Sequence, residues 1–147
     1  ALGGDIPDAF NNLGRLYIKE KKYPQAVALL SKGLVLAEKQ GSVLEINYSI
    51  FKNLGWARLK QGRNTEAKQH LQAAIGIAQR QEAAQYISNP VAANCLLAQV
   101  LDEQKEKGAI SEWQKCCQLG SRLNADEDEW LYMAQQKLEQ AGKKCNK

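Results

Sequence analysis

The sequence predicts an all-α fold in which antiparallel helical hairpins stack on one another. Three observations predict it: the composition, the spacing of the apolar residues and an internal repeat. The 147 residues include only 3 prolines and are rich in alanine, leucine, glutamine, lysine and glutamate, which are good helix formers. Hydrophobic residues make up 44% of the chain, so we expect an ordinary apolar core.

The internal repeat is carried by residues 10–14 (FNNLG), which recur as residues 51–55 (FKNLG). Each copy is followed by an alanine, a leucine and a small residue at positions i, i+4 and i+7, which share one face of a helix. These residues are Ala26, Leu30 and Gly33 in the first copy and Ala67, Leu71 and Ala74 in the second. The pattern indicates two helices per copy, with a small residue that lets the second helix approach the first closely.

Capping residues, prolines and glycines mark the expected ends of the helices. Asp5 is expected to cap the first helix with Pro7 early in it, and Asn64 is expected to cap the fourth helix. The other signals are Pro24, Gly41, a capping box at residues 42–45, Gln61-Gly62, Asn89-Pro90 and Lys107-Gly108. We therefore expect a single domain, residues 1–147, with units at about 6–41, 42–85 and 89–123 and a capping helix at 125–142.

The third unit matches the repeat less closely than the first two. Leu97-Ala98 stands where the other units have Leu-Gly, and Ala109, Trp113 and Cys116 repeat the apolar face. Trp113 and Trp130 lie on predicted buried stripes, so both are expected in the core. The acidic residues 126–129 suit the N-terminal end of the last helix.

The pattern Leu13-Gly14-x-x-Tyr17, followed by Ala26-x-x-x-Leu30, resembles the tetratricopeptide repeat. The resemblance implies a right-handed superhelical α-solenoid of three such units plus a C-terminal capping helix. Leu13 and Leu54 are 41 residues apart, whereas the family's repeat has about 34 residues. Arg58 stands where Tyr17 predicts an aromatic residue, and the proline that usually closes a repeat is missing. The seven extra residues are nearly two helical turns, so the apolar face is kept.

Signatures of catalysis are missing from the sequence, which has no phosphate-binding glycine loop, no HExxH and no GxSxG. His70 is the only histidine and is expected to be a partly exposed surface residue rather than a general base. We therefore expect no enzyme activity, no cofactor and no metal site.

The predicted binding site lies on the first helix of each hairpin, which in stacked hairpins lines a concave groove. Asn12 and Asn53 both precede Leu-Gly, and a carboxamide can pair with the backbone of an extended peptide whatever its side chains. The competing interpretations are that the asparagines merely solvate this face or cap a neighbouring helix, and that Trp56 packs against the next hairpin. The candidate partner-binding residues are Asn11, Asn12, Arg15, Lys19, Ser49, Lys52, Asn53, Trp56 and Lys60.

The expected function is a protein–protein interaction module in a larger bacterial signalling or regulatory protein. Residues 1–70 hold 11 Lys and Arg against 6 Asp and Glu, which favours an acidic protein or peptide as partner. Two alternatives stay open: a basic helical module associated with nucleic acid, which the mixed charges disfavour, and a scaffold that self-associates.

Four cysteines, Cys95, Cys116, Cys117 and Cys145, form no CxxC pair and are interpreted as reduced thiols in the cytoplasm. No stretch of the sequence reaches the roughly 20 apolar residues that a membrane helix needs. Because the chain begins at Ala1 without methionine, we expect a fragment of a longer protein or a processed product.

Overall fold

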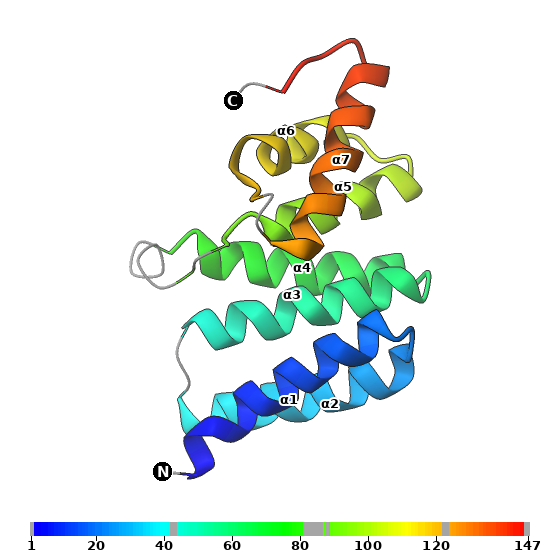
Figure 1. Cartoon of the computed structure of the whole chain (residues 1–147). Coiled ribbons are helices and arrows are strands. Elements are labelled where there is room, and N and C mark those ends of the chain that lie inside the picture. The colour runs from blue at the N-terminus through cyan, green and yellow to red at the C-terminus, as the bar shows by residue number, and fades with distance from the viewer. Residues whose placement is uncertain (1, 42–43, 81–86, 88, 122–123, 146–147) are drawn as a thin grey trace. The chain divides into compact units, whose positions relative to one another are not determined.

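The structure of the chain is a computed structural model that describes residues 2–41, 44–80, 87, 89–121 and 124–145, with the backbone alone at residues 2–5 (Figure 1). The described residues form seven α-helices and no β-strand, which confirms the predicted all-α class. The helices are α1 (Leu2–Lys19), α2 (Tyr23–Gln40), α3 (Leu44–Lys60), α4 (Asn64–Ala78), α5 (Ala92–Glu103), α6 (Ala109–Leu119) and α7 (Ala125–Gln140).

The chain divides into two compact units. Unit 1 is Ala1–Ser88 and contains α1 to α4, and unit 2 is Asn89–Lys147 and contains α5 to α7. The sequence predicted one domain, so this division differs from that expectation. The boundary coincides with Asn89-Pro90, which the sequence marks as the opening of the third hairpin.

Unit 1 consists of two hairpins, α1–α2 and α3–α4, and α3 packs against both helices of the first hairpin (Figure 1). Each hairpin closes on the glycine of the repeat. A Cβ atom at Gly14 would lie 2.6 Å from Cγ of Leu30, and one at Gly55 would lie 2.5 Å from Cγ of Leu71. Since real Cβ atoms do not approach carbon atoms so closely, only glycine lets the paired helices reach this separation.

Several predicted helix boundaries in unit 1 are confirmed. Pro24 lies in the first turn of α2, where a missing N–H is not needed for the helix. Gly41 ends α2 with φ of 62° and Gly62 follows α3 with φ of 74°, a backbone conformation that glycine adopts without a steric penalty. Half of the predicted capping box, residues 42 and 43, lies outside the described residues.

The predicted N-terminal ends of two helices, α1 and α4, are wrong. α1 begins at Leu2, so Asp5 and Pro7 lie inside the helix rather than at its start. Pro7 lies in the second turn of α1, where its missing N–H removes one helical hydrogen bond, and its side chain is buried. Asn64 is the first residue of α4 and not its cap, because Arg63 occupies the capping position without a side-chain hydrogen bond.

Unit 2 consists of the hairpin α5–α6, against which α7 packs. Trp113 and Trp130 are buried, as predicted, and the indole N–H of Trp113 donates to Oδ2 of Asp102 at 2.7 Å. The side-chain oxygen of Asn124 accepts from the backbone N–H groups of Asp126 and Glu127 at 3.0 and 3.2 Å. This cap satisfies two backbone donors at the start of α7 and fixes where the helix begins.

The cysteines of unit 2 are paired, so the prediction of reduced thiols is wrong. Cys95 of α5 is joined to Cys116 of α6, and Cys117 of α6 is joined to Cys145 beyond α7. The Cα atoms are 4.9 and 5.8 Å apart, within the range that disulfides need. Because disulfides persist in oxidising compartments, the expected cytoplasmic location loses the observation on which it depended. In the described part of the chain, no helix has the length and apolar character required to cross a membrane.

Candidate partner-binding site

A pocket of about 480 Å³ lies between the N-terminal halves of α1 and α3 in unit 1. Three of the predicted binding residues line it, namely Asn11, Asn12 and Ser49. The other lining residues are Asp8, Glu45 and Ile46. The structure therefore brings part of the predicted site together, in a hollow whose charged groups are carboxylates.

Two of the lining residues, Asn11 and Ser49, belong to a chain of side-chain hydrogen bonds between α1 and α3. Nδ2 of Asn53 donates to Oδ1 of Asn11 at 2.9 Å, and Nδ2 of Asn11 donates to Oγ of Ser49 at 2.9 Å. Asn53 and Asn11 are 1% and 6% exposed. Buried carboxamides that are paired in this way fix the register of two helices, because breaking one bond leaves a buried polar group without its partner.

The two asparagines that precede Leu-Gly have different environments, which corrects the expectation that both face a shared groove. Asn12 is exposed at the pocket, whereas Asn53 is buried between α1 and α3. The same difference separates Leu13, which is 42% exposed, from Leu54, which is 2% exposed. The reason is position in the stack: α3 has the first hairpin against it, whereas the equivalent face of α1 has no earlier hairpin in the described chain.

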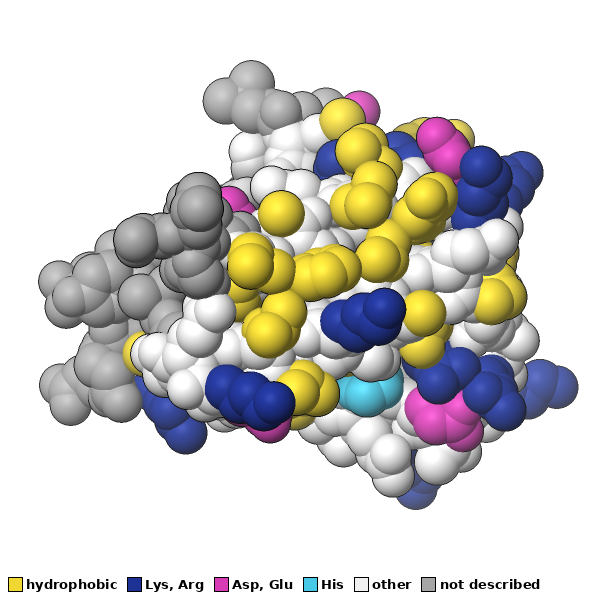
Figure 2. Space-filling model, turned by 90° about the horizontal axis from the view of Figure 1, so that it is seen from below, with side chains coloured by type: hydrophobic (Ala, Val, Ile, Leu, Met, Phe, Trp, Pro, Cys, Tyr) yellow, Lys and Arg dark blue, Asp and Glu magenta, His cyan; other side chains and the backbone are white. Residues whose placement is uncertain are grey.

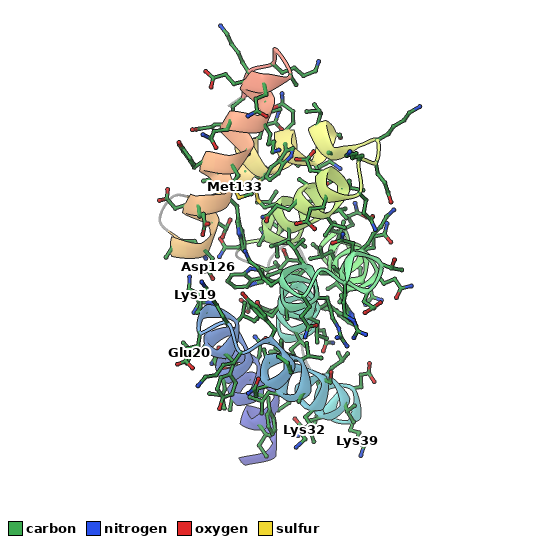
Figure 3. All side chains as sticks on the ribbon, turned by 90° about the vertical axis from the view of Figure 1, so that its right-hand side faces the viewer. Lys19, Glu20, Lys32, Lys39, Asp126 and Met133 are labelled. Atoms are coloured by element: carbon green, nitrogen blue, oxygen red, sulfur yellow. A yellow bond between two sulfur atoms is a disulfide. The ribbon has the colours of Figure 1, made fainter. Side chains whose placement is uncertain are left out.

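Trp56 does not present an exposed aromatic surface, contrary to its predicted role as an interface anchor. It is 6% exposed, and Nζ of Lys19 lies 5.9 Å from the centre of its ring. Lys19 is the last residue of α1 (Figure 3). Trp56 is therefore a buried residue with a cation–π contact to the preceding hairpin, α1–α2, whereas the competing interpretation had it pack against the next hairpin.

The remaining predicted residues are basic and follow the pocket along the same two helices. Arg15 and Lys52 are partly exposed and have other interactions, while Lys19 and Lys60 are exposed. Residues at steps of three or four share a helix face, so two parallel stripes result. On α1 the stripe is Asp8, Asn12, Arg15 and Lys19, and on α3 it is Glu45, Ser49, Lys52, Trp56 and Lys60.

Asp8 and Glu45 are the site residues that sequence reasoning missed. Each lies four residues before a predicted site residue, Asn12 or Ser49, and so occupies the same helical stripe. That spacing was the available signal. The excess of lysine and arginine over residues 1–70 favours basic site residues instead, and this is why the sequence pattern did not predict the two carboxylates.

His70 lies on α4, is not among the residues that line the pocket, and is partly exposed, as predicted. Its ring centre is 6.4 Å from that of Phe51. Burial lowers the pKa of His70 below 6.5, and the positive charge of Arg58 lowers it further, while Glu66 opposes both effects. Among the described residues, no cluster of His, Cys, Asp or Glu has the arrangement needed to hold a metal ion.

The repeated hairpins, each closed by a glycine–leucine contact, define a helical repeat protein of the helix–turn–helix type. The family model of the tetratricopeptide repeat matches residues 5–80, just over half of the chain, and the chain belongs to that family. Members typically mediate protein–protein interactions and are typically not catalytic. Neither a curated protein nor a solved structure matches this chain.

Proposed function

We propose that unit 1 binds an extended segment of a partner protein along the surface formed by α1 and α3. The observation that carries the proposal is the pocket at the N-terminal end of this surface, with the exposed carboxamide of Asn12 at its edge. A carboxamide offers a donor and an acceptor to a peptide backbone. The bonded asparagine pair Asn11–Asn53 holds α1 and α3 together beneath it.

The charges along the two stripes suggest the chemistry of the bound segment and its direction. Asp8 and Glu45 favour a basic side chain in the pocket. Lys19 and Lys60, at the C-terminal ends of the same helices, favour acidic side chains. We infer that the segment has a basic residue at the pocket and acidic residues further along, so the predicted acidic partner applies to one end of the surface only.

The same charges disfavour the nucleic-acid alternative at this surface. Phosphate groups would meet the carboxylates of Asp8 and Glu45 at one end of it. We also infer a binding role without catalysis, because members of the family are typically not catalytic.

The test uses two synthetic ten-residue peptides of equal composition, one with lysines at its N-terminal end and aspartates at its C-terminal end, the other with the order reversed. Binding to the full chain is followed by chemical-shift changes of the backbone amides. We expect one peptide to bind more tightly than the other and to shift the amides of α1 and α3. The Asn12→Ala variant should weaken that binding about fivefold, which corresponds to one hydrogen bond of about 1 kcal/mol.

The Asp8→Asn/Glu45→Gln double variant should remove the preference for a basic residue in the pocket while leaving helicity unchanged. Gln118→Ala is the matched control for Asn12→Ala, because Gln118 is an exposed carboxamide on α6 in unit 2. The proposal fails if the peptides shift amides elsewhere, or if the Asn12 variant and the double variant bind both peptides as tightly as the parent chain does.

A further inference from the structure

The two disulfides of unit 2 differ in how far solvent can reach them. Cys95 and Cys116, which form the first link, are each 0% exposed and join the helices of the α5–α6 hairpin. In the second link Cys117 is also 0% exposed, whereas Cys145 is partly exposed and lies beyond α7. A thiol in solution can therefore approach the second link from the side of Cys145.

The second link fastens residues 143–145, which follow α7 and turn back toward α6 (Figure 1). A hydrogen bond supports the same attachment, because Nε2 of Gln114 on α6 donates to the backbone oxygen of Lys144 at 2.8 Å. The end of α7 is secured separately, since the backbone N–H of Lys143 donates to the carbonyl oxygen of Leu138 at 2.8 Å. Opening the second link therefore loosens residues 143–145 and leaves this hydrogen bond of α7 in place.

The charges beside Cys145 favour attack by an anionic thiolate. Lys143 and Lys144 directly precede it in the chain, and both lysines are exposed. Cations attract a negatively charged reagent such as the thiolate of glutathione. Cysteines that react with thiols lie in partly exposed, positively charged surroundings of this kind, whereas buried structural cysteines are inert.

We propose that Cys145 is a site of thiol–disulfide exchange, at which anionic thiols of the glutathione type open its link to Cys117. The attacking thiolate forms a bond to Sγ of Cys145, the S–S bond breaks, and Sγ of Cys117 leaves with the electron pair and takes a proton from water. A second thiol then attacks the mixed disulfide at the sulfur of the reductant and releases Cys145. In total the link gains two electrons and two protons, and two thiols become one disulfide.

The response of unit 2 to reduction is thereby divided into two steps. The first step loosens residues 143–145 from α6, and the second removes the covalent bond between α5 and α6. The second step requires unit 2 to open locally, because both cysteines of that link are buried. We expect the first step to be at least about tenfold faster than the second.

The test places the full, oxidised chain in a buffer of reduced and oxidised glutathione. Samples are quenched with acid at intervals, free thiols are alkylated, and tryptic peptides are analysed by mass spectrometry. Cys145 and Cys95 lie on different tryptic peptides, so each reports its own link. We expect Cys145 to open at least about tenfold faster than Cys95. The glutathione adduct should be on Cys145 rather than on Cys117, and circular dichroism should show unchanged helicity after the first step.

The Lys143→Gln/Lys144→Gln variant tests the role of charge. Figure 2 shows lysine and arginine side chains at several places on one face of the molecule, so a loss of total charge must be separated from a loss of charge beside Cys145. Lys32→Gln/Lys39→Gln is the matched control, because both lysines are exposed on α2 in unit 1. The variant beside Cys145 should exchange about threefold more slowly with glutathione. It should exchange normally with cysteamine, whose reactive form has no net charge, and the control should match the parent chain with both thiols.

Opening of Cys95 as fast as Cys145 overturns the proposal, and so does a glutathione adduct on Cys117 in place of Cys145. Four cysteines that react before any reductant is added overturn it as well, because the links would then be absent. Equal exchange of glutathione with the parent chain and with the variant beside Cys145 overturns the preference for anionic thiols.

Discussion

Reduction of the two disulfides should destabilise unit 2 and leave unit 1 unchanged, because all four cysteines lie in unit 2. The sequence separations are 21 and 28 residues. In the chain-entropy description, closing loops of these sizes stabilises the folded state by about 3 kcal/mol each. A domain of this size has a total stability on the order of 5 kcal/mol, so losing both links should unfold much of unit 2.

The assay is hydrogen exchange of the full chain, measured by mass spectrometry with and without dithiothreitol. Peptides from α5, α6 and α7 should exchange much faster under reduction, whereas peptides from α1 to α4 should not change. Removing one link at a time separates the two contributions. Cys95→Ser/Cys116→Ser removes the link within the α5–α6 hairpin, and Cys117→Ser/Cys145→Ser removes the link to the segment after α7.

A thiol titration of the denatured, unreduced protein provides the control, and it should find no thiol that reacts. Four reactive cysteines would show that the pairs do not form in the protein. Equal exchange of α5 to α7 in the presence and absence of dithiothreitol would refute the energetic reasoning, because the links would then add nothing to stability.

Three further predictions concern packing and protonation. Gly55→Ala should cost about 1–3 kcal/mol in urea unfolding because its Cβ collides with α4, whereas Gly76→Ala, with nothing within 4 Å, should gain about 0.5–1 kcal/mol. Trp113→Phe should cost about 2 kcal/mol, by calorimetry, through the lost bond to Asp102 and a small cavity. Since burial holds the pKa of His70 below 6.5, stability should fall as the pH drops below 6.5, and unfolding of His70→Gln should show a flatter pH dependence.

The contacts within each hairpin of unit 1 and several helix boundaries could be predicted from the sequence. The spacing of Gly14 and Leu30, repeated at Gly55 and Leu71, predicts the close contact within each hairpin, because i, i+4 and i+7 positions define a helix face. Pro24 likewise marks the start of α2, since its fixed φ suits only the first turn.

The exposure of side chains that depends on which helices pack against them could not be predicted from the sequence, and neither could the pairing of the cysteines. Asn12 and Asn53 have the same local sequence, yet a hairpin covers only the second, so their exposure follows from their place in the stack. Trp56 is buried, whereas Arg15, the residue at the same position of the first repeat, is partly exposed. The position in the repeat therefore does not predict the burial of Trp56. The cysteine pairs join residues on different helices, and sequence spacing does not say which ones meet.

The hydrogen-bonded asparagine Asn11 has a consequence for how a ligand could act on unit 1. Its side chain accepts from Asn53 and donates to Ser49, so both functional groups of the carboxamide are already in use. A bound segment that stays on Asn12 leaves α1 and α3 rigidly coupled. One that replaces Ser49 or Asn53 as the partner of Asn11 breaks a hydrogen bond between α1 and α3, and faster hydrogen exchange of these helices would then report the deeper ligand.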